Sequence, residues 1–536
     1  MTFLKRTFLP ALALITAFTA TSHPRHDLPP MMGWSSWNTY RVHISDSLIC
    51  RQADLMVAKG LHRAGYTYIN IDDGFQGGRA ADGTLLTHPQ RFPHGLRPVI
   101  DHVHALGLKA GIYTDAGRHT CGNFWDHDSL GVGVGMYGHD ERDARFYFRE
   151  MNFDFIKIDF CGGDAKQNSE HLQLDERERY TAIRRAIDGV GRPDVRINIC
   201  RWNYPGTWVD SVGDSWRITA DIRASWSSVR SILSQNLYLS AYSRPGHYND
   251  MDMLEVGRGM TATEDLTHFA MWCMLNSPLH IGCDLGTLTP ATQALLTHPG
   301  LLALSQRPPY QQARPVALSA GCHVLVKDVE RLYGRRRAVA VYNPADKAAL
   351  ATLRFADVCL AGPVAVTDVV ADRAMGAHSD SLRLHVPAHG VRVVMLEGRR
   401  RLPQRRYEAE AARITSYQEL RNQQAARTGE YVHDPSCSAG MKAAWLGGSA
   451  ESDLTWSDVR CALSGDYMLS VACVSDGQQS IDVEVDGRHV GTLTADGLSR
   501  PALRLYLKKG RHRVRLHNDS QPMPDVDYME IIPHKG

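Results

Sequence analysis

Acidic residues follow several short apolar segments in the first 300 residues, and residues 153–164 (FDFIKIDFCGGD) are the clearest case. The apolar residues favour a short buried strand, which Lys157 and Asp159 interrupt and Gly162-Gly163 ends. A charged carboxylate at the tip of a buried strand is energetically unfavourable. A lysine two residues earlier favours its ionised, nucleophilic form. The segment therefore predicts a catalytic carboxylate, with a structural ion pair that closes the strand as an equal alternative.

Other strand candidates end in similar clusters of carboxylates and aromatic side chains. The clusters contain Asp72, Asp73, Asp115, Asp221, Asp252, Trp34, Trp37, Tyr113 and Trp202. Carboxylates accept hydrogen bonds from sugar hydroxyls and aromatic faces stack on sugar rings, so this combination favours a carbohydrate. The phosphate-binding glycine loop, HExxH and GxSxG motifs are all absent from the sequence. Because glycoside hydrolysis needs two carboxyl groups facing the scissile bond, Asp159 and Asp221 are the best pair.

The elements that must position these residues are strand-like and helix-like segments that alternate over residues 29–301. Eight strand candidates, nearly all with a polar or aromatic cluster at the carboxyl end, predict a (β/α)8 TIM barrel. A doubly wound sheet would instead gather such residues near one switch point. Residues 302–398 predict an antiparallel β-sandwich and residues 407–533 a C-terminal β jelly roll. The basic run over residues 398–406 is interpreted as a solvated linker.

Length and composition set the remaining bounds. The chain has 536 residues and a formal net charge of +2, which predicts several domains and gives no electrostatic case for nucleic acid or an anionic membrane. In residues 1–22, Lys5 and Arg6 precede an apolar run too short for a membrane span, which predicts a signal peptide and an exported, periplasmic or secreted protein. Eleven cysteines leave at least one thiol unpaired in a monomer, and their spacing shows no zinc site. The oligomeric state stays open.

Seven ordered motifs resemble glycoside hydrolase family 27, the α-galactosidase family of retaining exo-glycosidases, from about residue 29 to about residue 397. The family patterns MGWNSWN, DDCW, GIYSDAG, KxDxC, CEW, WRxxGDI and WNDPDML appear here as MGWSSWN, DDGF, GIYTDAG, KIDFC, CRW, WRITADI and YNDMDML. The resemblance implies that Asp159 is the nucleophile, that Asp221 is the acid/base and that Cys121 and Cys161 form a disulfide. The expected substrate-binding residues are Trp37, Asp72, Asp73, Tyr113, Lys157, Arg201, Arg217, Asp252 and Met253. No cofactor is expected for catalysis.

Four positions depart from the family pattern. Gly74 and Val42 replace the two partners of another family disulfide, so both halves are missing together, and Phe75 replaces a tryptophan. Arg201 stands where α-galactosidases carry a glutamate that accepts a hydrogen bond from the sugar 2-hydroxyl. A guanidinium has no acceptor, so Arg201 is expected to pair with a neighbouring aspartate or to contact the aglycone.

The activity expected from the resemblance is hydrolysis of terminal α-D-galactosyl residues from oligo- or polysaccharides. Within the family, the alternatives are a β-L-arabinopyranosidase, an α-N-acetylgalactosaminidase and an isomalto-dextranase. From another class, the alternative is a glycan-binding protein without catalysis.

The last domain resembles carbohydrate-binding modules that open with YEAE and end in a DYxEI strand. The resemblance implies a structural calcium ion at Glu408, Glu410 and Asp527, where carboxylates of the first and last strands converge. Trp445, Trp456 and Tyr467 are candidate sugar contacts, although a sandwich also needs aromatic residues in its core. The alternative is a domain that stabilises the enzyme and binds nothing.

Overall fold

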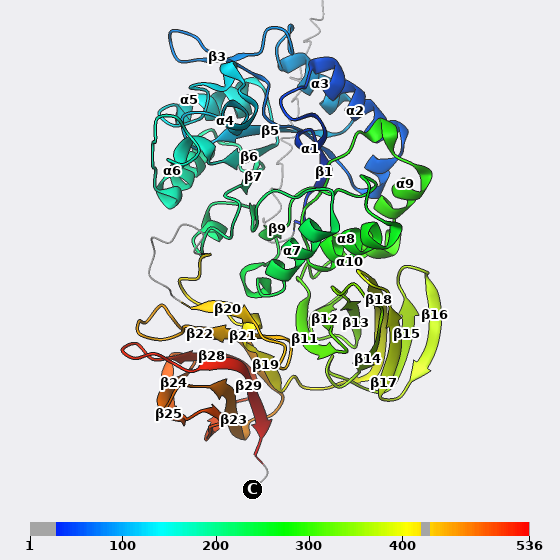
Figure 1. Ribbon diagram of the computed structural model, residues 1–536, viewed down its shortest axis with the longest axis vertical. Helices are drawn as coiled ribbons and strands as arrows, with labels where there is room; N and C mark the ends of the chain where they lie inside the picture. Colours follow the sequence, from blue (N-terminus) through cyan, green and yellow to red (C-terminus); the bar gives the residue numbers. More distant parts are fainter. Residues whose placement is uncertain (1–27, 420–428, 535–536) are drawn as a thin grey trace, which may run out of the picture.

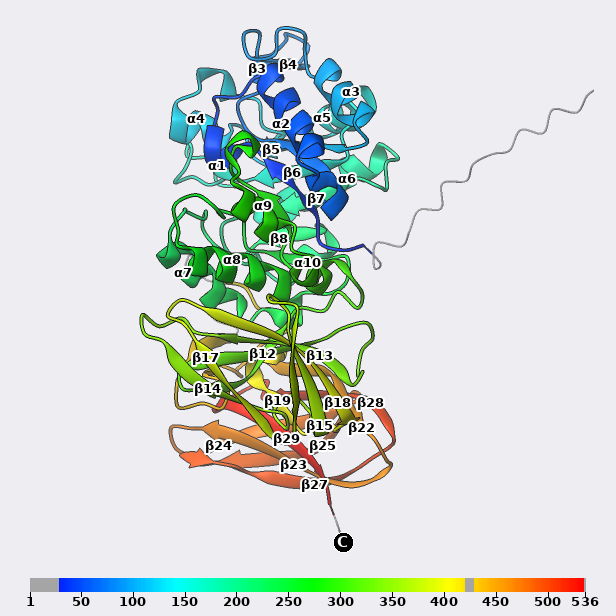
Figure 2. The same ribbon diagram turned by 90° about the vertical axis from the view of Figure 1, so that its right-hand side faces the viewer.

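The computed structural model describes residues 28–419 and 429–534, so the expected signal peptide lies outside the described residues. The α/β domain occupies one end of the molecule, and two all-β domains lie side by side at the other end (Figures 1 and 2). Within the described residues, no helix combines the length and the apolar character needed to cross a membrane.

The first domain is built on eight parallel strands whose order in the sheet follows the chain, which confirms the predicted barrel. The strands are β1 Met32–Ser35, β2 Tyr68–Ile71, β5 Lys109–Asp115, β6 Phe155–Asp159, β7 Arg196–Ile199, β8 Ser215–Arg217, β9 Tyr248–Asp250 and β10 Leu279–Ile281. β1 pairs with β10, and Leu254 just after β9 forms a parallel bridge with Ile281, which closes the ring.

Helices follow the strands and cover the outside of the barrel. They are α1 Trp37–Tyr40, α2 Asp46–Ala58, α3 Arg97–Ala105, α4 Cys121–Asp126, α5 Asp140–Arg145, α6 Glu176–Gly189, α7 Trp226–Asn236, α8 Ala262–Met274, α9 Pro290–Leu296 and α10 Pro299–Gln306. Side-chain caps mark the first residues of several helices. Ser45, Asp175 and Ser225 each accept a backbone N–H of the first turn of α2, α6 and α7, and Thr261 forms a capping box with Glu264 at the start of α8. A hairpin of β3 Gln76–Arg79 and β4 Leu85–Thr87 extends from the loop after β2.

The second domain is an antiparallel sandwich with a valine- and leucine-rich core of its own. Its strands are β11 Arg314–Ser319, β12 Cys322–Asp328, β13 Arg336–Tyr342, β14 Ala349–Arg354, β15 Leu360–Asp368, β16 Arg373–His378, β17 Ser381–Val386 and β18 Val391–Arg401. α10 crosses the boundary expected at residue 301, and β18 continues past residue 398. The linker interpretation is therefore wrong for residues 398–401, because this stretch pairs with β15.

The C-terminal domain consists of two further antiparallel sheets. Its strands are β19 Arg406–Glu408, β20 Glu430–His433, β21 Met441–Ala444, β22 Leu454–Cys461, β23 Gly465–Val474, β24 Gln479–Val485, β25 Arg488–Ala495, β26 Leu498–Ser499, β27 Ala502–Leu507, β28 Gly510–His517 and β29 Asp525–Pro533. The first strand, β19, pairs with the last, β29. Trp456 and Tyr467 are buried, so both are core residues and not sugar contacts, whereas Trp445 is 61% exposed.

A cluster of five tyrosines joins the C-terminal domain to the barrel. Tyr204, Tyr238 and Tyr242 come from the barrel, and Tyr417 and Tyr431 come from the C-terminal domain. The hydroxyl groups of Tyr242 and Tyr431 are 2.8 Å apart, and Tyr417 stacks on both Tyr204 and Tyr242. The buried cores of these two domains are therefore continuous.

Candidate active site

The carboxyl ends of the parallel strands bring the predicted catalytic side chains to one face of the barrel. Asp159 is the last residue of β6 and Arg217 the last of β8, while Asp72 directly follows β2. In the register of β5 and β6, Asp115 pairs with Asp159. This placement is the one expected for the catalytic face of a (β/α)8 barrel.

Asp159 is nearly completely buried, with 4% of its surface exposed. Its Oδ2 atom lies 3.8 Å from the Lys157 ammonium, whereas its Oδ1 atom has no hydrogen-bond partner among the described residues. Burial raises the pKa of Asp159 to about 6 against the opposing charge of Lys157, and Asp72 and Asp221 raise it further. An oxygen without a partner beside a fixed cation suits a nucleophile better than a structural ion pair.

Lys157 links Asp159 on β6 to side chains at β2 and at β5, the strand between them. Its ammonium lies 3.1 Å from Asp72 Oδ2 and 5.3 Å from the centre of the Tyr113 ring. Burial opposes the charge of Lys157, but Asp159 and Asp72 outweigh it and raise the pKa of Lys157 well above its usual value. Lys157 is therefore a permanent cation within the site.

Arg217 holds two carboxylates on the opposite side of the barrel. Its Nη2 atom lies 3.0 Å from Asp221 Oδ1 and 2.7 Å from Asp252 Oδ2. The Asp221 side chain is 59% exposed at the rim, whereas Asp252 is buried and its pKa is raised to about 6 by burial. Asp252 also accepts the Ile222 N–H at 2.8 Å, which anchors the loop that carries Asp221.

Asp73 and Tyr113 secure the loop after β5. The two oxygens of Asp73 accept the N–H groups of Gly74 and Gly122, and burial raises the pKa of Asp73 to about 7. The Tyr113 hydroxyl accepts the Cys121 N–H at 3.2 Å. Cys121 forms the expected disulfide with Cys161, and its sulfur lies 3.3 Å from Asp159 Oδ2.

Asp115 has a supporting role at the same place. Its Oδ1 atom accepts the N–H groups of Gly117 and Gly162, which join the loops after β5 and β6. The two glycines are in backbone contact, since a Cβ atom on Gly117 would lie 1.9 Å from the carbonyl carbon of Gly162. Asp115 thus caps the turn before the nucleophile loop.

Arg201 is buried and pairs with two carboxylates. Its Nη2 atom lies 3.0 Å from Asp164 Oδ2, and its Nε atom lies 2.5 Å from Glu176 Oε1. The sequence left two roles open for Arg201: pairing with a neighbouring aspartate or contact with the aglycone. The contacts with Asp164 and Glu176 correspond to the first role. The aromatic rings of Phe160 and Trp202 lie within 6 Å of its guanidinium group.

The other aromatic candidates differ in exposure. Trp37 is partly exposed, with the Arg41 guanidinium 4.8 Å from its ring centre. Trp34 is completely buried and donates its indole N–H to the Cys283 carbonyl, so it belongs to the core. Met253 is 6% exposed.

A cavity of about 20 Å³ lies inside the barrel, and it contains side chains that the sequence did not single out. Sequence reasoning missed Ser35, Asn70, Asn198 and His280. Asn198 donates to Asp250 Oδ2 at 2.7 Å, and burial lowers the pKa of His280 to about 4, so its ring is neutral. Asn70, Asn198 and His280 lie within strands, where a search of strand ends does not find them, whereas Ser35 ends β1. The cavity has room for about one water molecule, so it cannot enclose a sugar ring.

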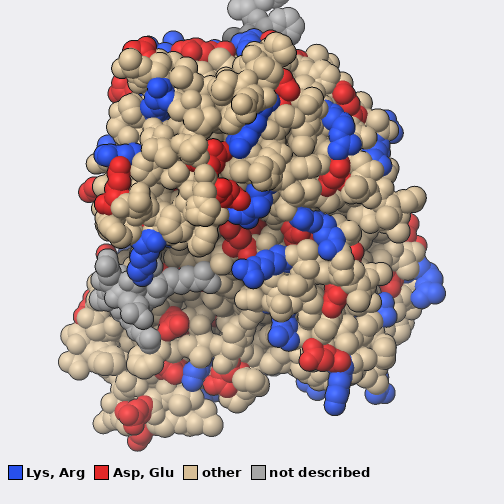
Figure 3. Space-filling model, turned by 45° about the horizontal axis from the view of Figure 1, so that its top comes forward, with Lys and Arg blue, Asp and Glu red and all other residues tan. Residues whose placement is uncertain are grey.

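On the face of the molecule drawn in Figure 3, acidic and basic side chains are interspersed without a large patch of one sign. Comparison with known proteins agrees with this fold. Residues 29–307 match the family model described as alpha galactosidase A, and residues 320–396 match that of the alpha galactosidase C-terminal beta sandwich domain. The chain belongs to the α-galactosidase family. Neither family model of these glycoside hydrolases extends beyond residue 396.

Individual members of the α-galactosidase family match most of the chain. α-Galactosidase A of Cellvibrio japonicus is 34% identical over 413 residues, which covers 72% of this chain and 97% of that protein. α-Galactosidase 2 of Arabidopsis thaliana is 36% identical over 356 residues, covering 66% and 84% of the two chains. The crystal structure of α-galactosidase I from Mortierella vinacea superposes with a TM-score of 0.63 at 28% identity, covering 70% of this chain and 98% of that one.

Proposed function

We propose that this enzyme is a retaining exo-glycosidase that removes terminal α-D-galactosyl residues from oligo- or polysaccharides. The observation that carries the proposal is the arrangement of two carboxylates: Asp159 buried with an oxygen that lacks a partner, and Asp221 at the rim on Arg217. The curated relatives described above are α-galactosidases.

The proposed reaction is a double displacement. Asp159 attacks the anomeric carbon while Asp221 protonates the leaving oxygen, which gives a covalent glycosyl-enzyme. Asp221 then removes a proton from the water that releases the sugar with retained configuration. Lys157 keeps Asp159 ionised, and Arg217 holds Asp221 in place through the salt bridge at 3.0 Å. Two carboxyl groups suffice for this chemistry without a cofactor.

The proposed sugar contacts divide into two groups. Trp37, Tyr113, Asp72, Lys157, Arg217, Asp252 and Met253 are proposed to surround the galactosyl unit. Asp73 is proposed to bind the sugar as well as to hold the loop, because each of its oxygens accepts one backbone N–H and keeps a second lone pair. Arg201 is proposed to act through Asp164 and Glu176, because its guanidinium is already paired.

The identity of the sugar is tested by initial rates on four nitrophenyl glycosides: α-galactoside, β-L-arabinopyranoside, α-N-acetylgalactosaminide and α-glucoside. We expect the α-galactoside to dominate. The observation that favours another sugar of the family is Arg201, which offers no acceptor to a 2-hydroxyl group. A dominant rate on another glycoside would replace the proposed substrate, and no turnover of any of them would favour a glycan-binding protein.

We propose that the C-terminal domain holds a structural calcium ion at Glu408, Glu410 and Asp527. Both carboxylate oxygens of Glu410 are buried without a hydrogen-bond partner, and burial raises the pKa of Glu408 to about 8. These orphaned oxygens fit a hard cation. The three carboxylates do not form a group with all ligand atoms within 4.8 Å; among the described residues only Asp115, Cys121 and Cys161 do, and that group contains the disulfide. Cation binding therefore requires the carboxylates to draw together.

The calcium proposal is tested by thermal unfolding. Calcium is expected to raise Tm by several degrees over protein treated with EDTA, since a ligand bound only by the folded state stabilises that state. Glu410→Gln should abolish the calcium effect. A Tm that does not depend on calcium would contradict the proposal.

We further propose that the protein is exported and that the C-terminal domain docks on glycan. Lys5 and Arg6 before the apolar N-terminal run and a disulfide beside the nucleophile support export. The 61% exposure of Trp445 supports a glycan contact. Co-sedimentation of a Trp445→Ala variant with insoluble galactosylated polysaccharide tests the contact, and unchanged retention would refute it.

A further inference from the structure

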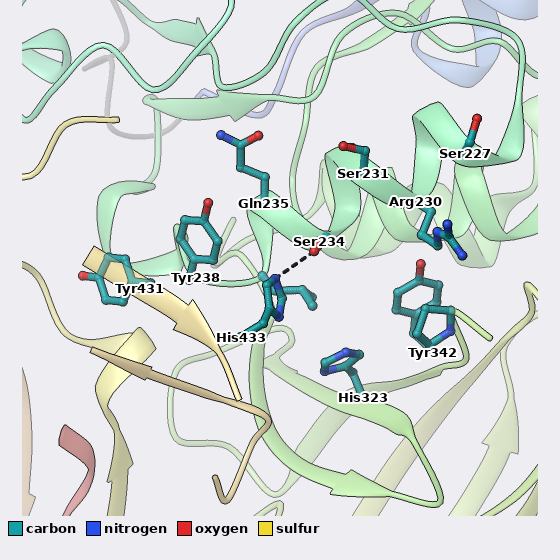
Figure 4. Close-up of a pocket in the computed structure, with 12 residues that line it drawn as sticks. Ser227, Arg230, Ser231, Ser234, Gln235, Tyr238, His323, Tyr342, Tyr431 and His433 are labelled. Atoms are coloured by element: carbon teal, nitrogen blue, oxygen red, sulfur yellow. Dashed lines mark hydrogen bonds between the residues drawn. The ribbon is translucent and has the colours of Figure 1, made fainter. Parts of the chain in front are cut away.

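A cleft of about 610 Å³ opens where the three domains meet (Figure 4). One wall is the outer face of α7, and the others come from β12 and β13 of the sandwich and β20 of the C-terminal domain. Its volume falls within the roughly 300–1,000 Å³ that is typical of small-molecule sites. No step of the proposed reaction uses this cleft.

Aromatic rings line the side of the cleft that faces α7. The His323 and Tyr342 rings stack with centres 6.2 Å apart, and Tyr238 stacks on Tyr431 at 5.4 Å. Tyr342 is 1% exposed, yet its hydroxyl has no hydrogen-bond partner, and neither has His323 Nδ1. An unpaired buried polar group is destabilising, and neither atom finds a partner within the described part of the chain.

The wall formed by α7 carries hydrogen-bonding groups without negative charge. Ser227, Ser231 and Gln235 follow at intervals of four residues and so share one face of the helix. Among the residues that the structure describes, no carboxylate lines the cleft, and Arg230 is its only permanently charged residue. Burial lowers the pKa of His323 to about 4, which leaves that ring neutral.

A ligand for this cleft needs hydroxyl groups on one side and an apolar ring face on the other. A sugar ring has both features, whereas a multiply charged anion would find one cation and a cationic ligand would find no carboxylate. We propose that the cleft binds a neutral pyranose unit of the glycan substrate as a second saccharide site. The proposal rests on the proposed function for the identity of the glycan.

The position of α7 relates the cleft to the active site. Ser227, in the first turn of α7, follows Asp221 by six residues, which span at most roughly 20 Å of extended chain. The near end of the cleft therefore lies within reach of the catalytic rim.

The test is calorimetric titration with raffinose in an Asp159→Asn background, which prevents turnover. Two binding events per chain are expected, and an added Arg230→Ala/Gln235→Ala pair should remove one of them. With Asp159 intact, the same pair should leave kcat/KM on nitrophenyl α-galactoside within twofold and raise KM on galactomannan at least threefold. Arg383→Ala is the matched control, because Arg383 is an exposed arginine on β17 outside the cleft.

Either a single binding event in the Asp159→Asn chain or two events that the cleft variant leaves unchanged would overturn the proposal. Tighter binding of galacturonate than of galactose, lost in the Arg230→Ala chain, would overturn the assignment to a neutral sugar. Failure of the proposed function would give a different result. None of the nitrophenyl glycosides would be hydrolysed, but the Arg230→Ala/Gln235→Ala pair would still abolish one of the two binding events.

Discussion

The two proposed catalytic carboxylates differ at the level of single residues. Asp159 is buried beside a lysine, whereas Asp221 lies at the rim on an arginine. These environments match their proposed roles, because a nucleophile needs a fixed position and one oxygen free to attack, while an acid/base must reach both the leaving group and water.

Asp159→Asn should lower kcat/KM on nitrophenyl α-galactoside to background, because an amide cannot form the glycosyl-enzyme. Asp221→Asn should lower it by about 10²–10⁴ on a natural galactoside and by less on nitrophenyl galactoside, whose leaving group needs little protonation. Steady-state kinetics on both substrates measures the difference. The control is Asp188→Asn, which changes an exposed side chain on α6. Full activity of Asp159→Asn would contradict the mechanism.

The pKa of Asp159 predicts the acid limb of the pH profile. Since its raised pKa is about 6 and the nucleophile must be ionised, kcat/KM should fall as pH drops below about 6. Lys157 lowers this pKa, so Lys157→Met should move the limb to higher pH, and Lys157→Arg should largely restore it. An acid limb that stays in place in Lys157→Met would contradict the assignment.

At the level of elements, the active site depends on contacts between the loops that follow adjacent strands. The loops after β5 and β6 meet at Gly117 and Gly162, and the Cys121–Cys161 disulfide crosses the same junction. Across the barrel, Asp252 anchors the loop after β8. The positions of the two catalytic aspartates therefore follow from loop packing as well as from strand ends.

Gly117→Ala should lower both Tm and kcat, because its Cβ atom would lie 1.9 Å from the Gly162 backbone and would push the nucleophile loop away. We expect a destabilisation of about 1–3 kcal/mol. Gly189→Ala in α6 is the matched control, since an added Cβ there meets nothing within 4 Å. Thermal unfolding and kinetics of both variants test the prediction, and equal behaviour would refute the loop contact.

At the scale of the whole molecule, the C-terminal domain is part of the enzyme's core. The segment before residue 420 reaches the barrel, where Asn203 donates to the Glu419 carbonyl and Tyr417 stacks between barrel tyrosines. The sandwich has its own core between its sheets, but its other face, with Leu325, Ala340 and Val393, belongs to the core of the barrel. We therefore expect the barrel and the C-terminal domain to unfold together.

Tyr417→Ala should cost about 3–5 kcal/mol, because it removes a buried aromatic ring from the tyrosine cluster. Tyr506→Ala, which alters a side chain that is 63% exposed on β27, is the matched control and should change little. Calorimetry should show one transition for the barrel and the C-terminal domain, at lower temperature in Tyr417→Ala. A C-terminal transition that is separate in the unmodified protein would contradict the shared core.

Local patterns in the sequence determined the barrel, the two β-sheet domains and the strand ends that carry Asp159, Asp221 and their neighbours. Strand and helix periodicity are properties of adjacent residues, and parallel strands present their carboxyl ends at one face, so order along the chain was sufficient. The tertiary structure decided which distant groups meet. It paired Arg201 with Glu176, buried Trp456 in a core, placed His280 and Asn198 in the barrel and formed the cleft between three domains. These outcomes depend on contacts between residues tens to hundreds of positions apart, which no local pattern encodes.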